Sequence, residues 1–113
     1  MDIESLREIC KELPHVTEDV KWGNDLCFLI GEKMFCVTGF ENPMKVSLKV
    51  TDEEFPELSN SPGIIVAPYV GRYKWILIED ANRFTKREWE HYITQSYNLV
   101  KAKLPKKVLD KLS

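Results

Sequence analysis

The sequence is poor in the residues from which metal centres and phosphate-binding loops are built. It holds two histidines and three cysteines, with no CxxC pair and no HExxH motif, so it shows no zinc-binding pattern. Its five glycines stand singly, which is typical of turns and bulges rather than of a glycine-rich nucleotide loop. A cysteine and a histidine could still meet in the fold as nucleophile and base, but no local pattern indicates it. We therefore expect no metal, no other cofactor and no enzymatic activity.

Long apolar runs are also missing. Nowhere do about 18 apolar residues follow one another, so no segment is predicted to span a membrane. The opening stretch, MDIESLREICKEL, is acidic where an export signal needs positive charge, and a cytoplasmic protein is expected. The length of 113 residues suits a single domain over residues 1–113, assumed to be a monomer.

Charge is unevenly distributed along the chain, although the formal net charge is only −2. Residues 1–60 hold 6 Lys and Arg against 13 Asp and Glu, a balance of −7, and residues 61–113 hold 10 against 5, a balance of +5. Such polarity can steer an anionic partner, because the local potential matters at contact. The overall pI of about 5.7 counts against a dedicated binder of duplex DNA, which is usually basic.

Hydrophobic spacing predicts a two-layer α+β fold. Apolar residues recur at three- and four-residue intervals in residues 2–13 and 85–104, which predicts an N-terminal helix and a long C-terminal helix. Alternation and turn signals predict an antiparallel sheet of about five or six strands, built largely from residues 16–50 and 64–80.

The start of the second long helix has the strongest local signal. Thr85 and Glu88 have the spacing of a capping box, and Phe84 with Trp89 has the spacing of a hydrophobic staple. Pro105 is expected to end this helix, because proline lacks the amide hydrogen that a helix interior requires.

Two apolar runs around Gly31 and Glu32 predict a β-hairpin. Glycine at the first turn position favours a two-residue type II′ loop. The resulting register pairs Ile30 with Lys33, Phe28 with Phe35, and Cys27 with Cys36. The opposed thiols could form a disulfide, but free thiols that fill an apolar sheet are favoured in a cytosolic chain.

The segment PYVGRYKW, residues 68–75, interleaves basic and aromatic side chains around a predicted hairpin turn at Gly71. This combination can hold phosphates and stack on bases. The simpler alternative is that Tyr73 and Trp75 pack inward while Arg72 and Lys74 keep the hairpin soluble.

The C-terminal stretch SYNLVKAKLPKK, residues 96–107, carries four lysines. Lys101 and Lys103 could simply complement the dipole at a helix end. Lys106 and Lys107 follow Pro105 and begin a new turn, so the dipole of one helix does not account for all four. The candidate nucleic-acid-binding residues are therefore Arg72, Tyr73, Lys74, Trp75, Lys101, Lys103, Lys106 and Lys107.

Several short motifs together resemble the MmcQ/YjbR family of small bacterial proteins. They are WG at 22–23, KMF at 33–35, SLK at 47–49, PY at 68–69, RYKW at 72–75 and the ending SY-x-LV-x-x-KLPKK at 96–107. The ending is the most specific of them. The resemblance implies a compact α+β fold with helices against one antiparallel sheet, and a DNA-binding role suggested by a double-wing shape.

Two hypotheses for function remain. The first is weak, largely sequence-independent DNA binding through the basic hairpin and the C-terminal lysines. The alternative is a non-enzymatic domain that binds a partner or a small ligand in an aromatic concavity near Trp22, Tyr69 and Trp75. One contiguous positive face would favour the first hypothesis, and scattered lysines would favour the second.

Overall fold

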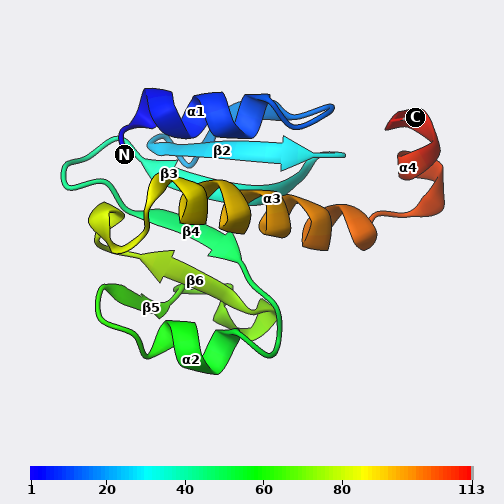
Figure 1. Cartoon of the computed structure of the whole chain (residues 1–113). Coiled ribbons are helices and arrows are strands. Elements are labelled where there is room, and N and C mark those ends of the chain that lie inside the picture. The colour runs from blue at the N-terminus through cyan, green and yellow to red at the C-terminus, as the bar shows by residue number, and fades with distance from the viewer. Residues whose placement is uncertain (113) are drawn as a thin grey trace.

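The computed structural model describes residues 1–112 as one antiparallel sheet with helices against it (Figure 1). The strands are β1 (Thr17–Lys21), β2 (Asp25–Ile30), β3 (Lys33–Gly39), β4 (Val46–Lys49), β5 (Ile64–Val66) and β6 (Trp75–Ile78). The helices are α1 (Ile3–Lys11), α2 (Phe55–Ser59), α3 (Lys86–Ala102) and α4 (Lys106–Leu112), with short 3₁₀ helices η1 (Gly71–Tyr73) and η2 (Ala81–Arg83). The two-layer α+β prediction is confirmed.

The six strands lie in the order β1-β2-β3-β4-β6-β5, and every neighbouring pair is antiparallel. The helices α1 and α3 contact each other, and α3 packs on β2, β3 and β4. The core between these helices and the sheet includes the fully buried side chains of Leu6, Phe28, Leu48, Ile76 and Ile93. One face of the sheet therefore carries most of the stabilising apolar burial.

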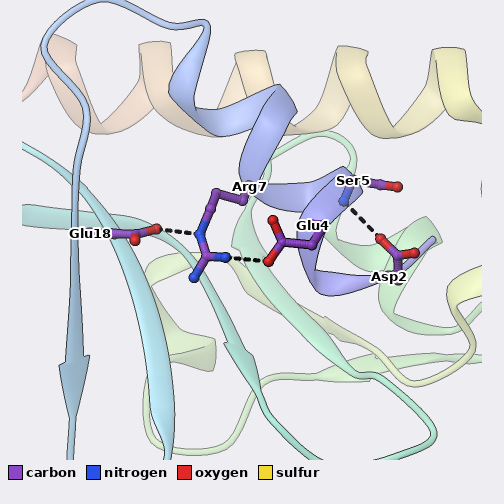
Figure 2. Close-up of polar contacts among 5 residues, drawn as sticks. All are labelled: Asp2, Glu4, Ser5, Arg7 and Glu18. Carbon is purple, nitrogen blue, oxygen red and sulfur yellow. Dashed lines mark hydrogen bonds and ion pairs between the residues drawn. The ribbon is translucent and has the colours of Figure 1, made fainter.

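The helix α1 is held at its start and against β1 by the polar contacts in Figure 2. The carboxylate of Asp2 accepts a hydrogen bond of 2.8 Å from the amide of Ser5, which caps the first turn. Arg7 pairs with Glu4 one turn earlier and, at 2.9 Å, with Glu18 on β1 (Figure 2). These contacts orient the helix, although partly exposed ion pairs contribute little to stability.

The helix α3 begins where the sequence predicts. The hydroxyl of Thr85 accepts from the amide of Glu88, and the carboxylate of Glu88 accepts from the amide of Thr85. The rings of Phe84 and Trp89 meet edge to face at 5.2 Å, so the predicted staple is present as well. The helix ends at Ala102, two residues before the predicted boundary.

The hairpin between β2 and β3 corrects two predictions. Gly31 and Glu32 both have positive φ, of 55° and 67°, which is the pattern of a type I′ turn and not of type II′. Ile30 does face Lys33, but Phe28 faces Cys36, because the register shifts between Phe28 and Leu29. The irregularity lets two consecutive residues of β3, Phe35 and Cys36, both lie buried in the core.

The predicted pairing of Cys27 with Cys36 is wrong for the same reason. Cys27 faces Val37, and the thiol of Cys36 is hydrogen-bonded to that of Cys10 on α1. This hydrogen bond, burial and the neighbouring thiols together raise the pKa of Cys36 well above its ordinary value. The three cysteines are free and buried, as the packing interpretation predicts.

The predicted tight hairpin at Gly71 is also wrong. Strand β5 ends at Val66, and residues 67–74 form a wider connection that contains η1 before β6 begins. Pro68 cannot donate to a strand ladder, so pairing stops shortly before it. A Cβ on Gly71 would lie 2.3 Å from the side chain of Val66, so this close approach requires glycine.

Candidate functional site

The sheet has a second face, opposite to α3, and the candidate site lies there. Leu48 and Ile76 point into the core, and side chains alternate along a strand. Their strand neighbours Lys49 on β4 and Trp75 on β6, which form a cross-strand pair, therefore point to the opposite face. The predicted aromatic residue Trp75 and a lysine that was not predicted thus share one surface.

An apolar groove of about 550 Å³ crosses this second face. Its lining consists of Trp22, Asp25, Met34, Val37, Pro68, Tyr69, Val70 and Trp75. Trp75 is only 6% exposed and forms part of the floor, whereas Trp22 is 70% exposed and Tyr69 is fully exposed. The structure therefore brings together the three aromatic side chains of the predicted concavity.

The two exposed aromatic residues sit on strained backbone. Trp22, in the turn between β1 and β2, has a φ of 54°, and Tyr69, in the connection before η1, has a φ of 67°. Bulky residues rarely adopt this left-handed conformation, and such strain occurs preferentially at functional sites. Glycine would fit both positions more easily, so the structure pays a cost to carry an aromatic ring there.

Lys49, which sequence reasoning missed, lies close to two predicted cations, Lys74 and Lys103. Its side chain is buried, with 8% exposure, and its ammonium group donates a hydrogen bond to the carbonyl of Tyr73. Burial lowers the pKa of Lys49, and the positive charges of Lys103 and Lys74 lower it further. Lys103 and Lys74, from two other segments, are therefore close enough to repel the ammonium group of Lys49, and Asp52 partly offsets this repulsion.

The hydroxyl of Ser96 on α3 fixes the backbone at this end of β4. It donates to the carbonyl of Phe35 at 2.6 Å and accepts from the amide of Lys49 at 2.9 Å. The pairing of β3 with β4 stops at Cys36 and Leu48, one position earlier. Ser96 thus links the carbonyl of Phe35 on β3 to the amide of Lys49 on β4, which do not bond to each other directly because of the irregularity in β3. The link positions Lys49.

The basic residues of the connection before β6 contact neighbouring rings. The guanidinium group of Arg72 donates to the hydroxyl of Tyr73 at 2.7 Å and lies 4.8 Å from the centre of its ring. The ammonium group of Lys74 lies 5.2 Å from the ring centre of Phe55. Arg72 and Tyr73 are both exposed, so these cation–π contacts leave the charge accessible to a ligand.

The C-terminal lysines extend the basic surface along α3 and α4. The ammonium group of Lys101 lies 5.7 Å from the ring centre of Tyr97, and Lys103 follows as the exposed C-cap residue of α3. Lys106 and Lys107 are exposed in the first turn of α4, as predicted for a new turn after Pro105. Cations at a helix start are disfavoured by its dipole, so capping does not explain them.

The cations of the candidate site have no ion-pair partner within residues 1–112. The ion pairs in this part of the chain join Arg7 to Glu4 and Glu18, and Lys45 to Glu79. None of them includes Lys49 or any predicted site residue. These cations can bind an anion such as a phosphate, and Asp52 offsets only part of the charge around Lys49.

No group of three or more histidine, cysteine, aspartate or glutamate side chains in residues 1–112 is arranged to hold a metal ion. None of the helices formed by these residues combines the length and the apolar character needed to cross a membrane.

Comparisons with known proteins agree with the fold. A crystal structure of a Deinococcus radiodurans protein with the DUF419 domain superimposes with a TM-score of 0.87 at 25% identity, covering 98% of this chain and 87% of that one. A Pseudomonas syringae protein superimposes with a TM-score of 0.72 at 19% identity, covering 88% and 98%. No curated protein matches the sequence. The YjbR family model matches residues 11–99, and the chain therefore belongs to the YjbR family.

Proposed function

We propose that this protein is a non-enzymatic DNA-binding protein whose contacts are weak and largely independent of sequence. The observation that carries the proposal is the gathering of Lys49, Lys74 and Lys103 at one end of the sheet, with no ion-pair partner within residues 1–112. Such a group lowers its own free energy by binding phosphates, because each phosphate reduces the repulsion between neighbouring ammonium groups.

The topology gathers these cations at one end of the sheet. Strand β4 ends there at Lys49, β6 starts there directly after Lys74, and α3 ends there directly before Lys103 (Figure 1). The helix α4, with Lys106 and Lys107, follows directly from this end of α3. A DNA backbone that lies across this end could contact cations from three segments of the chain.

The side chains of the candidate nucleic-acid-binding residues favour DNA binding that is independent of the DNA sequence. The cations of this set are suited to phosphates, which position a protein on DNA but carry no sequence information. The set contains no Asn or Gln, the side chains that commonly read adenine by two hydrogen bonds. The expected binding is therefore electrostatic and sensitive to salt.

The test is a titration of labelled duplex DNA at a series of salt concentrations. If about four to six phosphates are engaged, the logarithmic salt slope is roughly −4 to −5. The double variant Lys106→Ala/Lys107→Ala should reduce this slope by about one for each lysine that contacts a phosphate. Lys86→Ala/Arg87→Ala is the matched control, because it removes two exposed cations from the other end of α3.

Two results would overturn the proposal. One is affinity too weak to measure at about 50 mM salt, where electrostatic binding is strong. The other is a slope that falls equally in the control and in the Lys106→Ala/Lys107→Ala variant, since net charge alone would then explain it.

A second candidate function is favoured by the groove around Trp22, Tyr69 and Trp75. A cavity of about 550 Å³ with mostly apolar lining has the size and character of a small-molecule site. An indole titration followed by thermal unfolding tests it directly. A rise in the unfolding midpoint that is lost in Trp22→Ala supports this function, and an unchanged midpoint counts against it.

A further inference from the structure

The exposed rings of Trp22 and Tyr69 are unusual because the fold does not need them. Both line the groove, yet most of the surface of each side chain is in water. Each is held in left-handed backbone, where a smaller residue would be less strained. The two rings come from segments far apart in sequence and line the same groove, together with Met34 and Trp75. A flat ligand that stacks on aromatic rings matches this arrangement.

The charge next to the groove indicates which flat ligand fits. The connection that supplies Tyr69 continues directly into Arg72 and Lys74. Lys49 is the cross-strand partner of Trp75 and points to the same face of the sheet. The segment between the groove residues Tyr69 and Trp75 thus carries cations that form no ion pair within residues 1–112, which suits a planar group attached to a phosphate.

The negative charge of the groove lies on a different strand from these cations. Asp25 is the one charged side chain among the described residues of the lining. It starts β2 and forms a cross-strand pair with Lys21, whereas Trp75 and Lys49 pair on β6 and β4. Charge is therefore unevenly distributed around the groove. The carboxylate of Asp25 lies at the start of β2, and the cations belong to the segments next to Trp75. A nucleotide would orient with its phosphates toward Arg72 and Lys74.

We infer that the groove receives an unpaired nucleobase, stacked on Trp22 and Tyr69, while the adjoining phosphates of the same strand lie on Arg72 and Lys74. The inference rests on the proposed function and narrows its ligand to single-stranded nucleic acid. Bases inside a duplex are already stacked and cannot enter the groove, so duplex DNA engages the cations alone. Stacking on aromatic side chains tolerates any base, which agrees with binding that is independent of sequence.

The test compares two strands that differ only in their bases. One is a deoxythymidylate strand of about 12 nucleotides, within the range of known single-strand site sizes, and the other is an abasic strand of equal length and charge. The parent protein should bind the deoxythymidylate strand at least about fivefold more tightly than the abasic strand at low salt. Trp22→Ala and Tyr69→Ala should each remove most of this difference and leave binding of the abasic strand unchanged.

Phe40→Ala is the matched control variant. Phe40 is another exposed aromatic residue, with 51% exposure, but it lies outside the groove. This substitution should leave the preference for the deoxythymidylate strand as it is in the parent. All three substituted side chains are mostly exposed, so the variants should fold, and circular dichroism spectra that match the parent establish this.

The outcomes separate the inference from the function on which it rests. Equal affinity for the two strands, with measurable duplex binding, overturns the base site and leaves the proposed function standing. Binding of neither strand and of no duplex overturns both. Self-association or indole binding that depends on Trp22, without a preference for the strand that carries bases, also overturns the inference, because the groove then has another occupant.

Discussion

The two faces of the sheet use the same strands for different purposes. On one face, α1 and α3 cover side chains such as Phe28, Leu48 and Ile76, which are fully buried. On the other, Trp22 and Tyr69 stand exposed over an apolar groove. Stability comes mainly from the first face, since apolar burial is its principal source. The second, open face retains apolar and aromatic surface that burial does not explain, and for this reason we propose it as the binding face.

Ser96 connects the two faces. It belongs to the packed helix α3, yet its hydroxyl fixes the amide of Lys49, whose side chain points to the open face. The irregularity in β3 that makes this bridge necessary also places Phe35 in the core. Packing on one side therefore positions charge on the other, and substitutions can test whether the two faces are separable.

The largest expected effect on stability among the following variants is that of Ser96→Ala. It leaves the buried amide of Lys49 and the carbonyl of Phe35 without their shared partner, which should cost about 1–3 kcal/mol of unfolding free energy. Denaturant unfolding measures this change. Asn98→Ala, on the exposed side of the same helix, is the control and should change stability by less than about 0.5 kcal/mol. Equal effects of the two substitutions would show that the bridge contributes nothing.

A smaller loss is expected for Thr85→Ala on the packed face. The variant removes the hydroxyl that accepts from the amide of Glu88, and loss of such a cap costs about 0.5–2 kcal/mol. The thermal unfolding midpoint should fall, while binding to the single strand should stay as in the parent. An unchanged midpoint would mean that the capping box does not stabilise α3.

The next effect concerns pH and the buried Lys49. Burial, Lys103 and Lys74 lower its folded pKa below the ordinary 10.5, and Asp52 partly opposes them. The folded state therefore disfavours the charged form, and this penalty is fully present below the folded pKa. It is relieved as pH rises from the folded pKa toward 10.5. Methionine does not titrate, so Lys49→Met should lack this gain. Between the folded pKa of Lys49 and pH 10.5, the unfolding free energy of the parent should therefore rise relative to that of the variant. Stability curves that run parallel would contradict the lowered pKa.

The smallest effect on stability is expected for Trp22→Ala on the open face. The side chain is 70% exposed, and alanine in left-handed backbone is no more strained than tryptophan. The unfolding free energy should change by less than about 0.5 kcal/mol. A loss of more than about 2 kcal/mol would place Trp22 among the structural residues, and the contrast between the faces would fail.

Local signals in the sequence predicted the packed face well. The capping box of Thr85 and Glu88 depends on residues three apart, and the amphipathic helices depend on regular spacing. The irregularity at Phe35 was not predicted, because it depends on contacts with α3 that are distant in sequence. Lys49 was missed for the same reason. The alternating pattern around it predicted an ordinary strand residue, and its neighbours Lys74 and Lys103 come close to it only in the fold.

The site was predicted in part. Residues 68–75 were recognised as aromatic and basic, and Trp22, Tyr69 and Trp75 were grouped as a concavity, which the structure forms. The left-handed backbone of Trp22 and Tyr69 has no signal in the sequence, because both positions normally favour glycine or asparagine. The Trp-Gly pair at 22–23 was the nearest hint of a turn.

The most direct test of the binding face uses the indole signals of the three tryptophans. Trp22 and Trp75 line the groove, whereas the indole of Trp89 is buried in the packed face and donates to the carbonyl of Ala81 at 3.0 Å. In a ¹⁵N-labelled protein titrated with the deoxythymidylate strand, the signal of Trp22 should shift most and that of Trp75 should follow, while Trp89 stays in place. A shift centred on Trp89, or no shift of Trp22 when the strand is saturating, would contradict the assignment of the open face as the binding face.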